Sequence, residues 1–365
     1  MAIPQDTVWE IDEHTKAKHE ILRTYLNAWF PILTSAHPPV LYVDGFCGPG
    51  RYLGGEEGSP LIALRAAMGQ RRPLPGNPVF VFTDERPDRI ENLRGELQRL
   101  NPPSTFSIHA DVGRFADVFT PTLESLEREG KFLVPSFVFI DPFGFSGIPF
   151  TMIRRILRNP SCEVFITFMV NAVQRFVEHP VAAVRQEIEG LVGTNEVQQI
   201  LVLTGNRVEA LRGLYQRQLR TAATFVRSFE IRDAPEHILY YLFFASKNAL
   251  GHEKMKDAMW GVAPEGDFRF VDNTDSDQLV LLRQDPTARL AADLAARFAG
   301  QTLQAAEILR FVMDETGFVH KHTRAALSTL EGTGRLAVAP TKVDGKKRRK
   351  ASFPPEAVVA FPMTS

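Results

Sequence analysis

The stretch LYVDGFCGPG at residues 41–50 is a short apolar run that ends in an acid and continues into a loop with three glycines. It predicts a β-strand that brings Asp44 to its carboxyl end, followed by a loop without bulky side chains. Doubly wound α/β domains bind nucleotides against such a loop. Glycines also serve ordinary tight turns, so the loop alone leaves a purely structural role open.

Downstream of this loop, short apolar runs alternate with segments that have helical spacing. Four further strands are predicted, at residues 79–83, 105–109, 136–140 and 163–169. This alternation predicts a parallel sheet with right-handed crossovers. Two later runs, 224–231 and 237–246, predict an antiparallel hairpin. The expected fold class is therefore α/β, a parallel sheet with an antiparallel closing pair.

An acidic residue stands at the carboxyl end of each of the first four predicted strands. These residues are Asp44, Asp84, Asp111 and Asp141. Open α/β sheets bind their ligands at this edge. A helix cap accounts for one acid at such a position, but it does not account for four in succession. The pattern therefore predicts a ligand site at the carboxyl edge of the sheet.

Composition narrows the class of protein. Of the 365 residues, 44% are hydrophobic and 23% are charged, which is typical of a globular protein. The sequence has no apolar run of about 20 residues and no signal-peptide pattern, so we expect a cytoplasmic protein. Cys47 and Cys162 are too few for a thiolate zinc site, and no histidines stand at metal spacing, so we predict no metal. The net charge of −1 requires any nucleic-acid surface to be local.

The last hundred residues have the pattern of a second domain. We expect a first domain at residues 1–265, a polar linker at 266–286 and a winged helix at 287–365. The winged-helix prediction rests on three helices and a strand, at residues 287–298, 303–315, 320–331 and 335–340. Asp344-Gly345 then predicts a hairpin turn.

A basic cluster follows that turn, on the strand expected to return from it. Its members are Lys346, Lys347, Arg348, Arg349 and Lys350. On the wing of a winged helix, such a cluster lies where nucleic-acid phosphates bind. It is equally well explained as a solvated edge that discourages strand pairing.

The glycine loop and the closing hairpin resemble class I methyltransferases that use S-adenosylmethionine. DGFCGPG at 44–50 is similar to their first motif, particularly the D-P-F-x-G-S-G form of enzymes that methylate amino groups of nucleic acids. The resemblance to the three-Cys-motif partner family, TcmP, is closer and covers roughly residues 9–260. It rests on WEIDEHTKAKHEIL, VDGFCGPGRY with GSPLIAL, FTDERPDRIENL, FVFIDPFGF and YYLFFASKNALGHEKM. It implies a partner protein with three cysteines.

The methyltransferase resemblance also implies which residues contact the cofactor. They are Asp44, Gly45, Phe46, Gly48, Gly50, Asp84, Glu85, Asp111 and Val112. The loop would lie against the methionine and ribose parts, with Asp44 facing the ammonium group. Asp84 would accept hydrogen bonds from both ribose hydroxyls, with Glu85 as the alternative one position along. Asp111 and the backbone at Val112 would meet the adenine amino group.

Asp141, Pro142, Phe143 and Gly144 stand where amino-methylating enzymes have [DN]-P-P-[YF]. There the first side chain and the proline carbonyl accept hydrogen bonds from the target NH2 and aim its lone pair at the methyl group. The DPFG form is similar to transfer-RNA enzymes that methylate the exocyclic N2 of guanine. Phe143 or Phe145 would then stack on an extruded base, although both are also explained as core residues.

Together these patterns predict a methyltransferase that uses S-adenosylmethionine, acts on an exocyclic amino nitrogen of a nucleic-acid base and works with a three-Cys-motif partner. Two alternatives stay open. One is a methyltransferase that reaches a peptide, protein or small molecule through its partner. The other is a subunit that binds the cofactor without catalysis.

Overall fold

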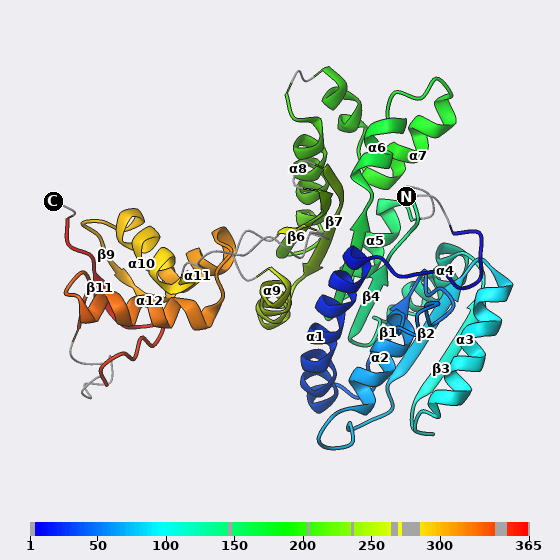
Figure 1. Cartoon of the computed structure of the whole chain (residues 1–365), viewed down its shortest axis with the longest axis horizontal. Coiled ribbons are helices and arrows are strands. Elements are labelled where there is room, and N and C mark those ends of the chain that lie inside the picture. Colours follow the sequence, from blue (N-terminus) through cyan, green and yellow to red (C-terminus); the bar gives the residue numbers. More distant parts are fainter. Residues whose placement is uncertain are drawn as a thin grey trace. The chain divides into compact units, whose positions relative to one another are not determined.

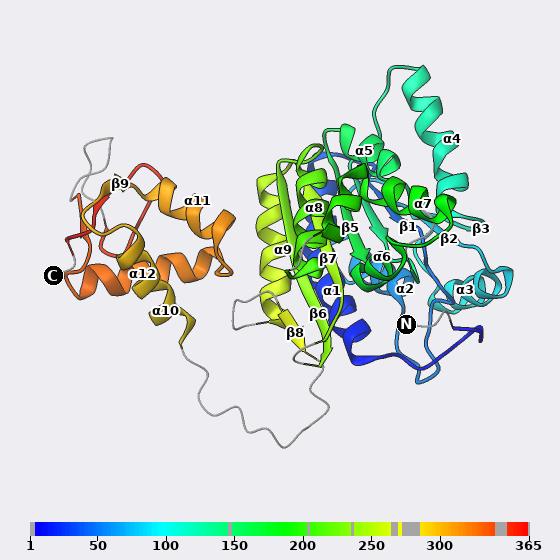
Figure 2. The ribbon, with the colours of Figure 1, turned by 90° about the horizontal axis from the view of Figure 1, so that it is seen from above.

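The computed structural model consists of two compact units (Figures 1 and 2). The first comprises Met1–Ala258 and Arg269–Asn273, and the second comprises Met259–Phe268 and Thr274–Ser365. The domain boundaries expected from the sequence stay a proposal. The structure describes residues 4–144, 148–202, 205–234, 237–263, 269–271, 285–339 and 349–363. Phe145 therefore lies outside the described residues.

An eight-stranded sheet with the order β3-β2-β1-β4-β5-β7-β6-β8 forms the centre of the first unit. Its strands are β1 (Leu41–Asp44), β2 (Val79–Asp84), β3 (Ser107–Val112), β4 (Ser136–Ile140), β5 (Cys162–Phe168), β6 (Phe225–Ala234), β7 (His237–Ser246) and β8 (Arg269–Val271). The first five strands are parallel, and β7 runs antiparallel to both β5 and β6. The predicted fold class is confirmed.

Helices cover both faces of this sheet (Figure 2). They are α1 (Glu13–Ala36), α2 (Ser59–Met68), α3 (Pro87–Leu100), α4 (Phe115–Arg128), α5 (Phe150–Arg158), α6 (Val170–Phe176), α7 (Ala182–Val192), α8 (Arg207–Arg220) and α9 (Ala249–Val262), with a 3-10 helix at Asn195–Val202. On one face, the α1 side chains Tyr25 and Trp29 pack on Phe137 of β4. None of the helices in the described part of the chain is both long and apolar enough to cross a membrane.

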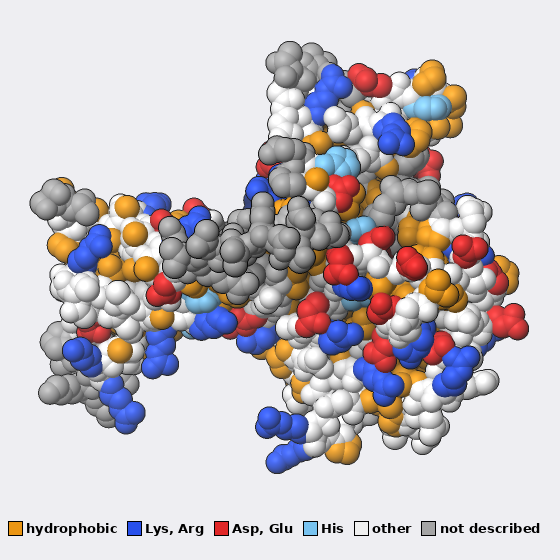
Figure 3. All heavy atoms as spheres, in the orientation of Figure 1, with side chains coloured by type: hydrophobic (Ala, Val, Ile, Leu, Met, Phe, Trp, Pro, Cys, Tyr) orange, Lys and Arg blue, Asp and Glu red, His pale blue; other side chains and the backbone are white. Residues whose placement is uncertain are grey.

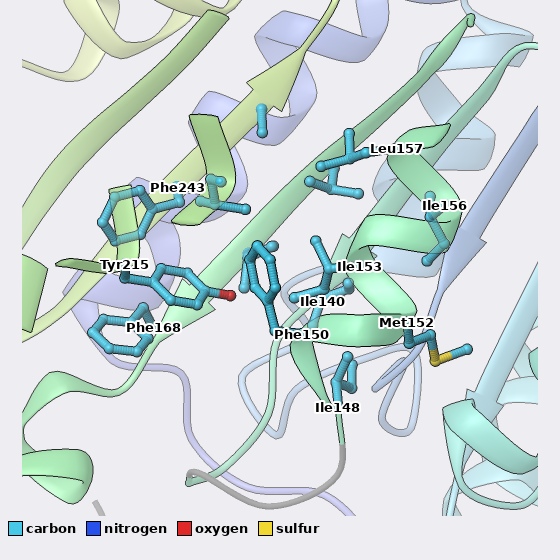
Figure 4. Close-up of a cluster of buried hydrophobic side chains, with 14 of the residues drawn as sticks. Ile140, Ile148, Phe150, Met152, Ile153, Ile156, Leu157, Phe168, Tyr215 and Phe243 are labelled. Carbon is cyan, nitrogen blue, oxygen red and sulfur yellow. The ribbon is translucent and has the colours of Figure 1, made fainter. Parts of the chain in front are cut away.

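The opposite face carries a large apolar core. Figure 4 shows Ile140 of β4 beside Ile153 of α5, and Tyr215 of α8 between Phe168 and Phe243. The Tyr215 and Phe168 rings are stacked, with 4.3 Å between centroids. Because β1, β4 and β5 are buried along their whole length, their sequences are almost continuously apolar, which is typical of central parallel strands.

The acids at the strand ends lie almost where the sequence predicts them. Asp44 and Asp84 are the last residues of β1 and β2, and Asp141 directly follows β4. Asp111 is an exception, because it lies inside β3 and not beyond it. The strand begins two residues later than predicted, since a turn in which the Phe106 N–H donates to the Pro103 carbonyl (2.9 Å) precedes it.

The edge strand β8 was not expected. Arg269–Val271 pairs in parallel with β6, within the segment predicted as a linker. A run of three residues is too short to show the period-two alternation from which a strand is predicted.

The second unit is a winged helix, as predicted. Its elements are α10 (Pro286–Arg297), β9 (Thr302–Gln304), α11 (Ala305–Glu315), α12 (His320–Gly332), β10 (Ala337–Val338) and β11 (Val358–Ala360). The strands form an antiparallel sheet in the order β10-β11-β9. Leu294, Ile308, Leu327 and Val359 join these elements in one buried core.

The returning strand was predicted too early in the sequence. It is β11, and the exposed residues Arg349 and Lys350 lie outside any strand. A turn takes their place, since the Ser352 N–H donates to the Arg349 carbonyl (3.2 Å) and Ala351 has a positive φ of 57°. The Asp344-Gly345 turn and the first three bases of the basic cluster, Lys346, Lys347 and Arg348, lie outside the described residues.

Candidate functional site

The glycine loop after β1 is tied to the strands on both sides of it. The Gly45 N–H donates to the Phe139 carbonyl of β4 (3.1 Å), and the Cys47 N–H donates to the Thr83 carbonyl of β2 (3.0 Å). Gly48 and Gly50 have positive φ values of 62° and 87°, which favour glycine. The loop backbone therefore lies across the carboxyl ends of β2, β1 and β4.

Asp44 is fully buried beneath this loop. Its Oδ1 accepts a hydrogen bond from the Phe46 N–H (3.2 Å). Its Oδ2 is buried and has no partner among the described residues. Burial raises the pKa of Asp44 to about 7, and the charges of Asp141 and Asp84 add to this rise. A buried acceptor of this kind suits a ligand that brings a positive charge or a donor.

Asp84 lies against the same loop. Its Oδ2 accepts from the Gly48 N–H (3.2 Å), its Oδ1 accepts from the Arg86 N–H (2.9 Å), and the buried Arg89 places Nη1 3.7 Å from Oδ2. The neighbouring Glu85 has an exposed side chain, 3.5 Å from Arg114 Nε. Of the two alternatives for a ribose-binding acid, the geometry favours Asp84.

Asp111 and Val112 lie on the outer strand β3, and both are exposed. Val112 is in register with Asp84 of β2. Asp111 is in register with the neighbouring Thr83. The two residues therefore border the acid cluster of Asp44, Asp84 and Asp141 at the edge of the sheet.

Asp141 belongs to a hydrogen-bonded group that the sequence did not predict. Lys18 of α1 places Nζ 2.5 Å from Asp141 Oδ2, and the Thr167 hydroxyl of β5 lies 2.5 Å from Oδ1. Lys18 is buried, with 5% of its surface exposed. The available signal was a lysine on the apolar face of a helix, one turn before Leu22.

A pocket of about 240 Å³ lies beside this group. Pro142 and Phe143 line it together with Asp141, so the structure brings three of the four DPFG residues to one cavity. Gly144 follows with a positive φ of 144°. The pocket wall also contains Tyr52, which follows the glycine loop, and two residues that were not predicted at the site, Trp9 and Tyr240.

The segment of residues 4–12, dark blue in Figure 1, contributes Pro4, Trp9 and Asp12 to the lining of this pocket. The Leu53 N–H donates to the Trp9 carbonyl (2.9 Å), and Arg89 Nη2 donates to the Pro4 carbonyl (2.9 Å). The Trp9 ring lies 4.7 Å from the Arg89 guanidinium and 5.8 Å from the Phe143 ring. The N-terminal segment is therefore part of the site.

The strand order, the glycine loop and the acids at the ends of β1 and β2 define a class I methyltransferase-like domain, which a winged helix follows. Residues 265–342 match a family model described as a GMT-like wHTH domain. No curated protein matches the chain. Membership of the three-Cys-motif partner family stays a prediction.

Three solved structures are distant neighbours. A Legionella pneumophila protein is 12% identical over 70% of this chain and 94% of its own, with a TM-score of 0.43. A putative O-methyltransferase from Klebsiella pneumoniae is 14% identical over 67% of this chain and 92% of its own, with a TM-score of 0.31. The plantazolicin methyltransferase BpumL, in complex with SAH, is 10% identical over 64% and 85%, with a TM-score of 0.27. These similarities are remote. The assignment of the first unit to the class I methyltransferase-like fold therefore rests on its strand order and on the residues of the site.

Proposed function

We propose that the first unit binds S-adenosylmethionine and transfers its methyl group to an exocyclic amino nitrogen of a nucleic-acid base, in cooperation with a three-Cys-motif partner protein. The observation that carries this proposal is the buried Asp44 oxygen, which no described residue of the chain partners, beside Asp84 and with Asp141 following the next strand of the sheet.

The residues at the glycine loop fit the cofactor. The Asp44 carboxylate suits its ammonium group, and the Asp84 carboxylate retains acceptor capacity for ribose hydroxyls beside its two backbone bonds. The proposed contacts are Asp44, Gly45, Phe46, Gly48, Gly50, Asp84, Asp111 and Val112. When bound, the cofactor supplies an electrophilic methyl group on a sulfonium ion.

The acceptor would enter the pocket beside Asp141. There the Asp141 carboxylate and the Pro142 carbonyl hold the amino group, and Phe143 offers a ring against which a base stacks. Asp141 also stabilises the positive charge that develops on the nitrogen. Its bonds to Lys18 and Thr167 fix the orientation of the carboxylate before the acceptor arrives.

Nucleoside mass spectrometry tests this function. Nucleic acids from cells with and without the gene are digested and compared, and purified protein with radiolabelled S-adenosylmethionine is then offered the unmethylated material. We expect one N-methylated nucleoside that depends on the gene. Label that enters protein or peptide, with none in nucleic acid, would support the alternative substrate class.

Cofactor affinity is expected to depend on pH through Asp44. A bound cation favours the ionised carboxylate, so affinity should fall about tenfold for each pH unit below the Asp44 pKa of about 7, with protons released on binding. Calorimetry in buffers of different ionisation enthalpy measures both effects. Asp44→Asn should remove this pH dependence, and an unchanged pH profile in that variant would contradict the assignment.

The raised pKa of Asp44 also makes the stability of the unligated protein depend on pH. This stability falls as the pH rises, whereas cofactor affinity increases. Without ligand, the folded protein retains a proton on Asp44 that the unfolded chain releases. This contribution to the free energy of unfolding is present below the ordinary carboxyl pKa and is lost as the pH rises through about 7. The cofactor should therefore raise the melting temperature more at pH 8 than at pH 6.

The basic cluster is the proposed phosphate contact of the winged helix. Over the face of the first unit drawn in Figure 3, Lys and Arg side chains are interspersed with Asp and Glu, so no single-sign field covers that face. Among the described members of the cluster, Arg349 and Lys350 are both exposed. Exposed bases on a wing favour phosphate binding that does not depend on base sequence.

Charge reversal at Arg349 and Lys350 should weaken nucleic-acid binding for all sequences alike and reduce the salt slope by about one for each phosphate that the variant no longer neutralises. Fluorescence anisotropy across a salt series measures both quantities. The matched control is reversal of Arg71 and Arg72, two exposed arginines of the first unit. If the two double variants behave alike, the basic cluster only contributes solubility.

A further inference from the structure

The acceptor pocket combines flat aromatic walls with three charged residues, Lys18, Asp141 and the more exposed Asp12. Its aromatic members are Trp9, Tyr52, Phe143 and Tyr240. The Trp9 ring meets the Tyr52 and Phe143 rings edge to face, with 5.6 Å and 5.8 Å between centroids. The charged pair, Lys18 and Asp141, also lines the pocket. A flat ring with polar atoms on one edge is the ligand shape that matches these groups.

Lys18 offers donors that Asp141 does not use. An ammonium group has three N–H donors, and in the described part of the chain Asp141 is the acceptor within hydrogen-bond range of Nζ, at 2.5 Å. The Tyr240 ring lies 5.3 Å from Nζ, on the same pocket wall. Lys18 therefore presents hydrogen-bond donors to the pocket beside the acceptor oxygens of Asp141.

A donor and an acceptor side by side recognise the complementary pair on a ligand. Adenine, cytosine and guanine each have an exocyclic NH2 next to an unprotonated ring nitrogen. The NH2 group can donate to Asp141, while the ring nitrogen accepts from Lys18. An aliphatic amine matches poorly, because at neutral pH it is protonated and carries only donors, so it has no atom that can accept a hydrogen bond from Lys18.

We propose that Lys18 determines acceptor specificity: it donates a hydrogen bond to the ring nitrogen adjacent to the amino group that Asp141 holds. This inference rests on the proposed function, because it takes the pocket beside Asp141 as the acceptor site. It adds a substrate class, a neutral amino-heteroaromatic ring, and a residue of α1 that reads it. Thr167 supports the pair by fixing the other oxygen of Asp141.

Nucleoside binding by the full-length protein tests the proposal without methyl transfer. The probes are adenosine, cytidine and guanosine, each compared with the deaza analogue in which C–H replaces the acceptor ring nitrogen. Affinities are measured by ligand-observed NMR, alone and with S-adenosylhomocysteine present. At least one nucleoside should bind about tenfold or more tightly than its deaza analogue, because loss of the nitrogen leaves a charged donor unpaired.

Lys18→Met should abolish this discrimination, since it keeps the apolar stem and removes the donors. Lys16→Met on the same helix is the matched control and should retain it, because the Lys16 side chain is exposed and pairs with Glu13. If Lys18→Met fails to fold, the paired neutral variant Lys18→Met with Asp141→Asn removes the uncompensated charge and takes its place.

The proposal would be overturned by equal binding of every nucleoside and its deaza analogue by the wild type, by full discrimination in Lys18→Met, or by no nucleoside binding at millimolar concentration. Tighter binding of a peptide glutamine amide than of any nucleoside would also overturn it, by assigning the pocket to an amide. Discrimination that depends on Lys18, found in a protein that transfers no methyl group, would support Lys18 as the reader and refute the proposed methyltransferase activity alone.

Discussion

Asp84→Ala is expected to weaken S-adenosylmethionine binding by about 1.5 to 3 kcal/mol, the range for hydrogen bonds to a charged group. The reason is geometric. Asp84 is the last residue of β2, it is buried against the glycine loop, and its carboxylate accepts from the Gly48 N–H of that loop. Isothermal titration calorimetry measures the loss directly.

A second variant is needed to interpret Asp84→Ala, because the Asp84 carboxylate also accepts hydrogen bonds from the Gly48 and Arg86 N–H groups, and Ala removes these bonds as well. Asp84→Asn keeps an acceptor for one of these bonds but lacks the charge and the second acceptor oxygen. Asp84→Asn should preserve the melting temperature better than Asp84→Ala while still lowering the affinity for the cofactor. If Glu85→Ala weakens binding more than Asp84→Ala, the ribose contact belongs to the neighbouring residue.

Much of the first unit could be predicted because its strands are buried on both faces. Residues 136–140 form β4 with the predicted bounds, since four consecutive apolar residues directly before Asp-Pro leave little alternative. The position of Asp44, Asp84 and Asp141 at one sheet edge follows from the parallel topology alone. Local patterns and sheet geometry are sufficient for these features.

The rest of the site depends on contacts between distant parts of the chain. Lys18 forms a hydrogen bond with Asp141, which lies 123 residues away in the sequence. Arg89 forms one with Pro4, which lies 85 residues away. No local period encodes such a pairing. Trp9 begins the WEIDEHTKAKHEIL motif of the family resemblance, but no role at the site was predicted for it, because a single aromatic residue before a helix is common in ordinary cores. Residues that complete a site from a distant segment are those that sequence patterns miss.

The two buried cations make the acid cluster compatible with folding. Three carboxylates at one sheet edge repel one another: burial is the main cause that raises the pKa of Asp44, and the charges of Asp141 and Asp84 raise it further. Arg89 lies 3.7 Å from Asp84, and Lys18 lies 2.5 Å from Asp141. Asp44 is the member that no salt bridge pairs in the described part of the chain. This leaves one acid of the cluster available to a cationic ligand.

Asp141→Ala is expected to reduce the rate of methyl transfer by about 10²-fold or more, with little change in cofactor affinity. The variant loses both the acceptor that aligns the amino group and the negative charge that stabilises the methylated nitrogen. Asp141→Asn retains an acceptor, so its rate of methyl transfer should lie between that of Asp141→Ala and that of the wild type. Turnover is measured at saturating cofactor and acceptor, beside calorimetry of cofactor binding and a melting curve.

A control for stability is needed in this test, because Asp141 pairs with the buried Lys18. Removing Asp141 leaves a buried ammonium without its carboxylate, which by itself destabilises the protein. Combining Asp141→Ala with Lys18→Met removes that charge, so the double variant should regain stability and remain inactive, while exposed Asp117→Ala on α4 should keep full activity. Restored turnover in the double variant would reduce Asp141 to a counterion of Lys18. Loss of cofactor binding in both variants would place Asp141 in the cofactor pocket, because a residue that only aligns the acceptor leaves that equilibrium unchanged.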